Sequence, residues 1–569
     1  MSAIEKLITD NIDVWLSAIK RKNSQGRGSS NKIELYGIKK LRELILELAV
    51  RGQLVPQDPN DEPASVLLEK IAKEKAKLFK EGKIKKQKVL PEISEDSKTF
   101  ILPDNWNWVR FQDISEYIQR GKGPKYSESG KVKVISQKCI QWGGFDLTPA
   151  RHVDDISLIG YQSERFLKSN DLLWNSTGTG TVGRINVIDD VEERSLVADS
   201  HVTVIRTLLV NTGYIWSYIS APGVQNRIEP THENALVSGT TKQVELNTSS
   251  VIQLVLPIPP INEQNRIVAK VSELMSLCDQ LESQQNNSIA AHEQLVEVLL
   301  NTLTQSANNQ ELTNNWQRLA EHFDTLFTTE SSIEKLKQTI LQLAVMGKLV
   351  PQDPNDEPAA VLLEKIAKEK AKLIEEGKIK KQKALPEITE EEKPFELPEG
   401  WVFTRFGDVF DLEYGNNLPA RKRSGTGEYA VYGSNGVVGT HNQSCIKRPC
   451  IIVGRKGSAG ALNLCLDKEC WVTDVAYSVV PSNGLDLEYV FRMFHTLGLG
   501  VLGKGIKPGL NRNEAYILCV AIPPLKEQHR IVAKVEEIMA LCEQLKARLT
   551  DAQATQLNLA DALAEQAIA

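Results

Sequence analysis

The chain contains the same irregular phrase of eleven residues twice. LVPQDPNDEPA runs from Leu54 to Ala64 and again from Leu349 to Ala359, at an offset of 295 residues. Proline, aspartate and asparagine favour turns over core helices. Two such turns at matched places predict that the chain folds as two copies of one architecture.

The repeated block is wider than this phrase, because residues 41–93 match residues 336–388 at the same offset. Each copy has the pattern of a helix, a turn and a second helix. In the first copy the helical spacing i, i+3, i+4, i+7 is carried by Leu41, Leu44, Ile45 and Leu48. Gly52 follows where a glycine ends a helix, and the second helix is expected to end near Gly82.

A second pair of segments, 258–284 and 522–548, matches at an offset of 264 residues. A Pro-Pro pair marks the start of a helix in each. Apolar residues then recur in the alternating steps of a coiled-coil seam: Ile267, Val271, Leu274, Cys278 and Leu281 in the first, and Ile531, Val535, Ile538, Cys542, Leu545 and Leu549 in the second. A helix of about 40 residues from Asn262 would be about 60 Å long.

The segments between these blocks, 99–257 and 394–521, share little text and are called here the first and second variable domains. The second is 31 residues shorter. Both open alike, with LPDNWNWVRFQDI and LPEGWVFTRFGDV, and both contain a central strand followed by a glycine-rich turn. Short β-branched runs broken by Gly, Asn and Pro predict mixed, mostly β domains.

The offsets also relate the two ends of the chain. Ala569 corresponds to position 305 in one frame, and the likeness of ITDN at 8–11 to LTNN at 312–315 places Met1 opposite the same position. We therefore predict an α+β protein with a pseudo-two-fold cyclic repeat, neighbouring termini and long antiparallel coiled-coil helices between the two domains. The expected regions are 1–98, 99–257, 258–393, 394–521 and 522–569.

Composition excludes several classes of protein. With 41% hydrophobic and 25% charged residues, the 569-residue chain is typical of soluble proteins of three to five domains. It contains neither an apolar stretch long enough for a membrane span nor the pattern of a signal peptide. Eight cysteines favour a reducing cytoplasm over a disulfide framework. The net charge of −5 means that any basic nucleic-acid surface is local.

Motifs for catalysis are absent or incomplete. GTGTVGRI, from Gly178 to Ile185, has the glycine spacing of a phosphate-binding loop, but Arg184 and Ile185 stand where that loop needs Lys and Ser or Thr. A glycine turn that brings Thr179, Thr181 and Arg184 close to a ligand fits better. The sequence contains no His-Glu-x-x-His helix, Gly-x-Ser-x-Gly elbow or adenine-methyltransferase Pro-Pro-Tyr signature.

Two further patterns have alternative interpretations. Cys445-x4-Cys450 and Cys465-x4-Cys470 have zinc-knuckle spacing, or are small buried residues in strands; the second is favoured, and no metal ligand is assigned. The stretch 70–88 contains nine lysines and two glutamates. It is either a solvated helix face or an arm that contacts phosphates or a partner.

Polar side chains gather in glycine-bearing loops of both variable domains. Arg, Lys, Asn and Gln bond to base edges, and Lys and Arg also bind phosphates. The candidates in the first domain are Gln119, Arg120, Lys122, Lys125, Tyr126, Gln137, Lys138, Gln141, Asn175, Ser176, Thr177, Thr179, Thr181, Arg184, Lys242 and Gln243. Those in the second are Asn416, Asn417, Arg421, Lys422, Arg423, Ser434, Asn435, Arg455, Lys456, Ser458, Lys504, Lys507, Asn511 and Arg512.

Over essentially its full length the chain resembles the specificity subunit (HsdS) of type I restriction-modification systems. The resemblance is carried by the duplicated LPxxW opening, the G-[ST]-x-G turn, the LAVxGxLVPQ helix end and the Pro-Pro-x-x-Glu-Gln-x-Arg-Ile entry to each long helix. It implies two target recognition domains that each recognise half of a bipartite, asymmetric DNA sequence. It implies further that Glu263–Ile267 and Glu527–Ile531 are scaffold positions rather than catalytic ones.

The resemblance also implies partners. Two modification (HsdM) subunits would dock on the repeated helices and restriction (HsdR) subunits would join them, in a complex that methylates adenine and cleaves double-stranded DNA. S-adenosylmethionine, ATP and Mg²⁺ would belong to those partners, and none to this chain, which would be non-catalytic by itself. Two other hypotheses remain at this stage: a self-contained DNA-modifying enzyme, and a coiled-coil scaffold without DNA contact.

Overall fold

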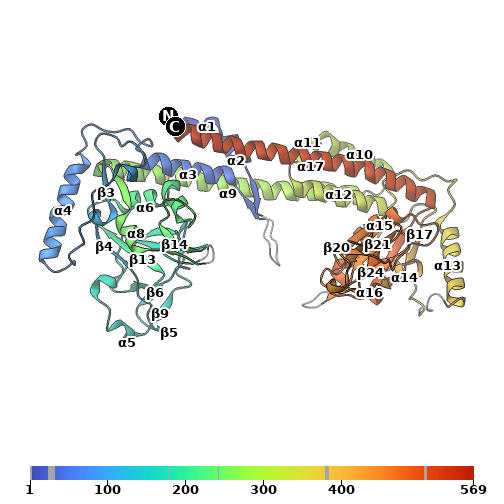
Figure 1. Cartoon of the computed structure of the whole chain (residues 1–569). Helices are drawn as coiled ribbons and strands as arrows, with labels where there is room; N and C mark the ends of the chain where they lie inside the picture. The colour runs from blue at the N-terminus through green and yellow to red at the C-terminus, as the bar shows by residue number, and fades with distance from the viewer. Residues whose placement is uncertain are drawn as a thin grey trace. The chain divides into compact units, whose positions relative to one another are not determined.

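The computed structural model describes residues 3–22, 32–178, 180–240, 243–377, 383–504 and 509–568. Its contacts divide the chain into two units, one of residues 1–287 and 553–569 and the other of residues 288–552. Each unit contains one variable domain together with helices from distant parts of the sequence (Figure 1). Among the described residues, no helix combines the length and the apolar character that a membrane span requires.

The N-terminal region of the first unit is mainly helical. It comprises α1 (Ala3–Asp10), α2 (Ile12–Ser17), the hairpin of β1 (Lys20–Lys22) and β2 (Lys32–Glu34), α3 (Tyr36–Val50) and α4 (Ala64–Lys80). Gly52 has φ of +73°, and the amide of Gln53 donates to the carbonyl of Leu48 at 2.9 Å, which closes α3. Gly82, at φ +68°, follows α4 in the same way. The predicted helix, turn and helix are confirmed.

The two longest helices are α9 (Ile261–Gln305) and α17 (Leu525–Ile568), of 45 and 44 residues. The predicted seam residues of α9 are at most 7% exposed. Ile531, Val535 and Cys542 of α17 are equally buried, while Ile538, Leu545 and Leu549 are half-buried against the same core. The heptad pattern therefore identified the buried face of both helices.

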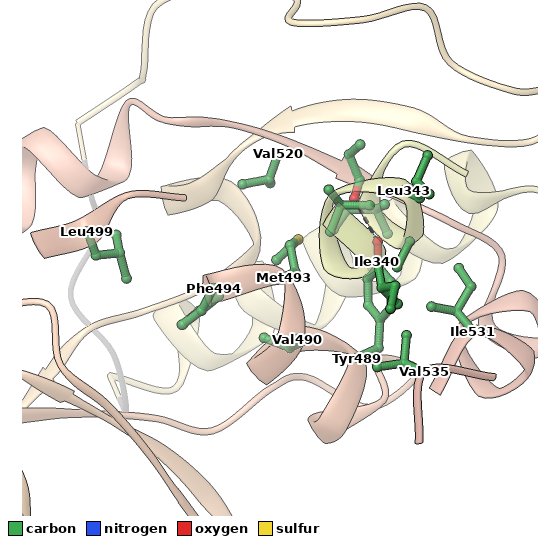
Figure 2. Close-up of a cluster of buried hydrophobic side chains, with 14 of the residues drawn as sticks. Ile340, Leu343, Tyr489, Val490, Met493, Phe494, Leu499, Val520, Ile531 and Val535 are labelled. Carbon is green, nitrogen blue, oxygen red and sulfur yellow. Dashed lines mark hydrogen bonds between the residues drawn. The ribbon is translucent and has the colours of Figure 1, made fainter. Parts of the chain in front are cut away.

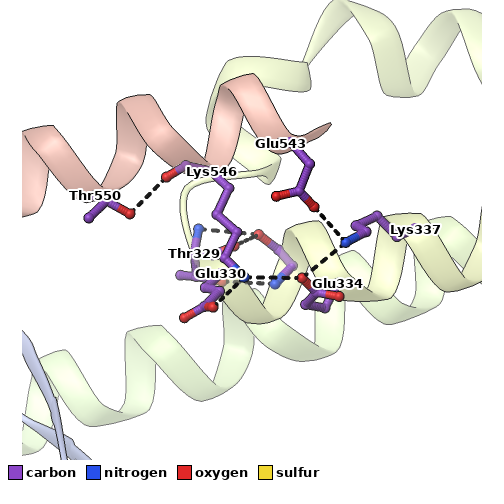
Figure 3. Close-up of polar contacts among 8 residues, drawn as sticks. Thr329, Glu330, Glu334, Lys337, Glu543, Lys546 and Thr550 are labelled. Carbon is purple, nitrogen blue, oxygen red and sulfur yellow. Dashed lines mark hydrogen bonds and ion pairs between the residues drawn. The ribbon is translucent and has the colours of Figure 1, made fainter. Parts of the chain in front are cut away.

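Within the second unit, α9 and α17 run antiparallel on either side of α12 (Glu330–Val345). Lys335 and Lys348 of α12 bond in ascending order to Glu297 and to the carbonyls of Thr304 and Ser306 on or just beyond α9. Figure 3 shows the opposite order on α17, where Lys546 pairs with Glu330 at 2.6 Å and Glu543 with Lys337 at 2.8 Å. The remaining helices outside the domain are α10 (Asn309–Glu321), α11 (Phe323–Leu326) and α13 (Ala359–Glu375).

The same contacts recur in the first unit at the offsets seen in the sequence. Arg42 of α3 bonds to Asp279 of α9 at 2.7 Å, which corresponds to Lys337 and Glu543. Lys40 lies 3.3 Å from Asp561 near the end of α17, which corresponds to Lys335 and Glu297. The end of α17 thus takes in the first unit the place that the end of α9 takes in the second. This is the predicted pseudo-two-fold cyclic repeat.

The first variable domain is closed at its base by the antiparallel pair of β3 (Asn107–Arg110) and β16 (Val255–Ile258). One four-stranded sheet has the order β11 (Ile185–Ile188), β10 (Asp171–Asn175), β13 (Val202–Thr207), β4 (Ser115–Arg120). A second has the order β12 (Leu196–Ala198), β6 (Lys133–Ile135), β9 (Arg151–Val153), β5 (Tyr126–Ser127). Two hairpins join them, β7 (Ile140–Gln141) with β8 (Gly144–Phe145) and β14 (Val237–Thr240) with β15 (Gln243–Leu246). The helices are α5 (Asp155–Leu158), α6 (Thr212–Ser220), α7 (Pro222–Gln225) and α8 (Thr248–Gln253).

The second variable domain repeats this plan in fewer residues. Its base is the antiparallel pair of β17 (Val402–Arg405) and β27 (Cys519–Ile522). The main sheet has the order β18 (Glu413–Tyr414), β24 (Ala476–Val479), β21 (Cys450–Gly454), β22 (Leu462–Cys465). The smaller sheet is β20 (Gly436–His441), β19 (Tyr429–Gly433), β23 (Trp471–Val472), and β25 (Gly503–Lys504) pairs with β26 (Gly509–Leu510). The helices are α14 (Phe406–Val409), α15 (Leu487–Thr496) and α16 (Arg512–Tyr516).

One continuous apolar core attaches the second variable domain to its helices. Figure 2 shows Ile340 and Leu343 of α12, Val490 and Met493 of α15, and Ile531 of α17 in this cluster. All five are at most 2% exposed. Burying one such aliphatic side chain stabilises the fold by about 1.5–3 kcal/mol. The orientation of the domain on its scaffold is therefore held by apolar packing within the unit.

Candidate nucleic-acid interface

A glycine turn follows the central strand in each variable domain, as the sequence predicts. The turn joins β10 to β11 and β21 to β22. The amide of Gly183 donates to Asn175 O at 3.0 Å, and that of Gly460 donates to Gly454 O at 2.8 Å. Gly178 and Gly457 have φ of +102° and +84°, values that residues with a Cβ rarely adopt. The two turns share one backbone frame although their lengths and side chains differ.

A second loop lies against this turn in both domains. The amide of Gly121 donates to Val202 O and that of Gly415 to Ala476 O, at 2.9 and 3.2 Å. A Cβ at Gly121 or Gly415 would lie 2.1 or 2.2 Å from a carbonyl oxygen of the adjacent segment. Only glycine fits so close an approach. These bonds make Arg120 and Tyr414 equivalent positions, at the ends of β4 and β18.

The structure buries two of the candidate residues in the first domain. Asn175 and Ser176 are 0% exposed, because they end the central strand β10. Asn175 Nδ2 donates to Gln137 O at 3.0 Å, and Ser176 Oγ lies 2.5 Å from Thr203 Oγ1. Their side chains hold the turn in place, so we leave both out of the interface proposed below.

Two arginines of the first domain are bound within the protein. Arg120 pairs with Glu245 at 2.7 Å and donates to Leu246 O at 2.8 Å. Arg184 donates to Gln141 Oε1 at 2.8 Å and to Gly180 O at 2.7 Å. A guanidinium held in this way presents a fixed rather than a flexible charge. The sequence gave no sign of Glu245 as a partner of Arg120, because 125 residues separate them.

The other candidates of the first domain fall into two groups. Gln137, Thr177, Thr181 and Gln243 surround the glycine turn, where Thr177 Oγ1 lies 2.7 Å from Nδ1 of His201, a residue that the sequence did not single out. Lys125 and Tyr126 lie instead at the edge strand β5, where the Arg151 guanidinium is 4.1 Å from the Tyr126 ring centre. The exposed candidates are Gln119, Lys122, Lys125, Tyr126, Lys138 and Gln243. Thr179 and Lys242 lie outside the described residues.

In the second domain most candidates lie around the equivalent turn. Arg455, Lys456 and Ser458 belong to it, Ser434 contacts it, and Lys456 pairs with Gly509 beside Asn511 and Arg512. Asn511 Oδ1 accepts from Asn513 N at 3.0 Å and so caps α16. Arg423 donates to Val438 O at 2.7 Å. The exposed candidates are Asn416, Asn417, Arg421, Lys422, Asn435, Lys456 and Asn511. Lys504 is described only as part of β25, and Lys507 lies outside the described residues.

The four cysteines of the second domain pack close together. Cys450 and Cys465 face each other on β21 and β22, and Cys450 Sγ lies 3.9 Å from Cys470 Sγ. These three are 0% exposed in an apolar cluster with Tyr432 and Ile452, whereas Cys445 is half-buried. Among the described residues, no group of three or more His, Cys, Asp or Glu side chains has the arrangement of a metal site. The cysteines therefore take part in the packing of the smaller core.

The repeated phrase connects α3 to the start of α9. Gln57 of the phrase donates to Glu263 at 2.9 Å, and Asp61 pairs with Arg266 at 2.7 Å. Trp106 Nε1 donates to the second oxygen of Glu263 at 3.0 Å. The second copy repeats all three contacts: Gln352 with Glu527, Asp356 with Arg530 and Trp401 with Glu527.

This arrangement explains the burial and the charge of the repeated Glu-Gln pair. Glu263 and Gln264 are 1% and 0% exposed, and Gln264 Oε1 accepts from the amide of Asn211 at 2.9 Å. Burial raises the pKa of Glu263, although the hydrogen bonds from Gln57 and Trp106 oppose this. The hydrogen bond from Arg266 lowers the pKa of Asp61. All of these contacts are structural, as the resemblance implied for Glu263–Ile267 and Glu527–Ile531.

The lysine-rich helices α4 and α13 are anchored at one matched position. Lys75 Nζ donates to Gln112 O at 2.6 Å, and Lys370 Nζ to Gly407 O at 2.7 Å. Burial lowers the pKa of Lys75 to about 8. On α4 only Ala64, Leu67 and Ile71 are buried, so its remaining lysines form a solvated face.

Comparison with known proteins places the chain in a family. Residues 103–291 and 398–552 match the type I restriction modification DNA specificity domain. The chain is 40% identical to the specificity subunit of the type I restriction enzyme EcoAI of Escherichia coli over 598 aligned positions, which cover 100% of both chains. This chain belongs to the type I restriction-modification specificity subunits.

Two further similarities agree. The EcoEI specificity subunit of Escherichia coli is 38% identical over 100% of both chains. A chain in a solved structure of the complex assembly and conformational transition of a type I R-M system has a TM-score of 0.51 and 16% identity, covering 82% of this chain and 99% of that one. At this identity the second match supports the fold alone.

A specificity subunit is the DNA-recognition component of its complex and is not itself an enzyme. This excludes the self-contained DNA-modifying enzyme and favours recognition over a scaffold without DNA contact. The two variable domains are its target recognition domains.

Proposed function

We propose that each target recognition domain contacts double-stranded DNA through the side chains around its glycine turn. The observation that carries the proposal is the shared backbone frame, because both domains place cationic and amide side chains around the same turn although their sequences differ. In the first domain these are Gln119, Lys122, Gln137, Lys138, Gln141, Thr177, Thr181, Arg184 and Gln243, with Thr179 and Lys242 as sequence-based candidates. Lys125 and Tyr126 form an outlying group.

In the second domain the proposed contacts are Asn416, Asn417, Ser434, Asn435, Arg455, Lys456, Ser458, Asn511 and Arg512. Arg421, Lys422 and Arg423 lie on the neighbouring loop before β19, and Lys504 and Lys507 are sequence-based candidates. Exposed lysines and arginines bind phosphates, whereas amides and guanidiniums also bond to base edges in the major groove. The DNA-facing surface is local, in accord with the net charge of −5.

Lysine substitutions test this proposal in the assembled modification complex. Lys122→Gln in the first domain and Lys456→Gln in the second should each weaken DNA binding. Each should also reduce the slope of log affinity against log salt by about 0.9, the contribution of one phosphate contact. Lys73→Gln on the solvated face of α4 is the control. It should leave affinity and slope unchanged, which also tests the alternative that this helix contacts phosphates. Unchanged binding in both domain variants would refute the proposal.

We propose that the duplicated scaffold docks two modification (HsdM) subunits, with restriction (HsdR) subunits joining them. The matched contacts of α3 and α9 and of α12 and α17 support two equivalent surfaces. S-adenosylmethionine, ATP and Mg²⁺ would act in those partners, in the cytoplasm where the cellular DNA lies. Native mass spectrometry of the co-expressed complex should give two modification subunits for each chain, and a single one would refute the two-site proposal.

A further inference from the structure

Tyr414 differs from the other side chains around the second glycine turn. It ends the short edge strand β18, and 54% of its side chain is exposed. Beneath it, the ring of Tyr477 lies 5.0 Å away and is 2% exposed. Large aromatic side chains are usually buried, so an exposed ring supported by a buried one marks a position held for contact.

Two guanidiniums flank this ring. The Cζ atoms of Arg455 and Arg512 each lie 5.1 Å from the centre of the Tyr414 ring, within cation–π range. Arg455 Nε and Nη2 both donate to Asp474 O, at 3.0 and 2.6 Å, so its fork has a fixed orientation. Among the described residues, no ion pair joins Arg455 or Arg512 to a carboxylate. Both charges remain available to an anionic ligand.

The equivalent position of the first domain has the opposite character. Arg120 occupies it, and the Glu245 carboxylate 2.7 Å away neutralises its charge. The position equivalent to Arg455 is Ser176, which is fully buried. One backbone frame therefore carries an arginine–glutamate pair in one domain and a tyrosine between two free arginines in the other. A position that differs while its frame is shared is where the two domains can prefer different bases.

We propose that Tyr414, positioned by Arg455 and Arg512, determines the base preference of the second target recognition domain, an inference that rests on the DNA contact proposed above. The exposed ring face offers an apolar contact to a base, such as a thymine methyl group, and the hydroxyl offers a hydrogen bond to a base edge. The two guanidiniums bind the adjacent phosphates and keep the ring in register.

The test uses the complex of this chain with its methyltransferase partner, S-adenosylmethionine and a library of DNA sites. Sequencing of methylated products gives the base preference of both halves of the target. Tyr414→Ala should reduce discrimination by about tenfold at one base pair of the second half-site, since a good side-chain contact to a base contributes about 1–3 kcal/mol. The first half-site should keep its preference. Tyr414→Phe separates the hydroxyl from the ring.

Leu466→Ala is the matched control, because Leu466 is an exposed apolar residue (63%) of the same domain outside this cluster. It should change neither half-site, and thermal unfolding should show every variant folded. Full base preference in Tyr414→Ala would overturn the proposal. An equal loss of affinity for all second half-sites would also overturn it, while leaving the general DNA contact intact. Failure of that contact would appear instead in Lys122→Gln and Lys456→Gln.

Discussion

Arg266 Nη2 lies 2.7 Å from Oδ2 of Asp61, and this ion pair joins the repeated phrase to the start of the long helix α9. Its copy, Arg530 with Asp356, has a distance of 2.8 Å. In both pairs the aspartate is the buried partner, at 7% exposure. The phrase is thus repeated because each long helix needs the same attachment to the helix that precedes its domain.

Asp61→Asn should destabilise the first unit, because it removes the charge from a buried hydrogen bond to Arg266. We expect a loss of about 1–2 kcal/mol, seen as a lower unfolding temperature. Asp356→Asn is the matched variant and should lower the stability of the second unit by a similar amount. A change in either variant below about 0.3 kcal/mol would show that these pairs contribute little, as many surface ion pairs do.

The same pair predicts a dependence on pH. Since Arg266 lowers the pKa of Asp61, the pair stabilises the fold fully above the ordinary aspartate pKa of about 3.9. This contribution is lost as the pH falls through the lowered value. Thermal unfolding between pH 2 and 7 should therefore show a difference between wild type and Asp61→Asn that is constant at the upper end and shrinks below about pH 4. A difference that grew on acidification would contradict the assignment.

Exchanging residues 99–257 for the corresponding domain of another specificity subunit should change one half-site only. The domain is closed at its base by β3 and β16, so its contacts with the target are made by loops of its own. Methylome sequencing of cells that carry the hybrid gives the result. The reciprocal exchange of residues 394–521 is the control and should change the other half-site. A change in both halves would show that these bounds cut through a shared recognition surface.

Lengthening the helical link should alter the spacing of the half-sites. We expect seven residues, inserted after Gln285 in α9 and after Asp551 in α17, to keep the seam in register. They add about 10 Å, or about three base pairs of DNA. Methylome sequencing should show a longer gap between two unchanged half-sites. An unchanged gap would mean that the helices do not set the spacing.

A cyclic permutant should fold and recognise the same target. Lys40 contacts Asp561 as Lys335 contacts Glu297, so a linker of about three residues from Ala569 to Met1 would resemble the natural turn after Gln305. Opening the chain between Ala307 and Asn308 keeps Asn308 as the N-cap of α10, through its 2.9 Å bond to Glu311 N. Exposed connections tolerate such cuts. Spin labels at positions 3 and 567 of the wild type should lie close together, and a separation near 60 Å would refute the cyclic repeat.

Much of the scaffold follows from local sequence. Identical text produces the same helix end at Gly52 and Gly347, where φ is +73° and +68°, because a glycine C-cap depends on a few neighbouring residues. The seam from Ile267 to Leu281 predicts a buried face, because helical periodicity is itself a local property. The partners of Glu263, by contrast, come from Gln57 and Trp106, far away in the chain. Only the folded structure brings them together.

The sequence by itself determined the duplication, the glycine turns and the kinds of side chain beside them. The tertiary structure decided which of those side chains can contact DNA. Asn175 and Ser176 are polar residues in a polar loop pattern, but the central position of β10 buries them. Tyr414 has no pattern of its own, since its strand has two residues and its arginine partners lie 41 and 98 positions further along the chain. Exposure and charge pairing depend on sheet neighbours that no local spacing encodes, and so the scaffold was predictable where the interface was not.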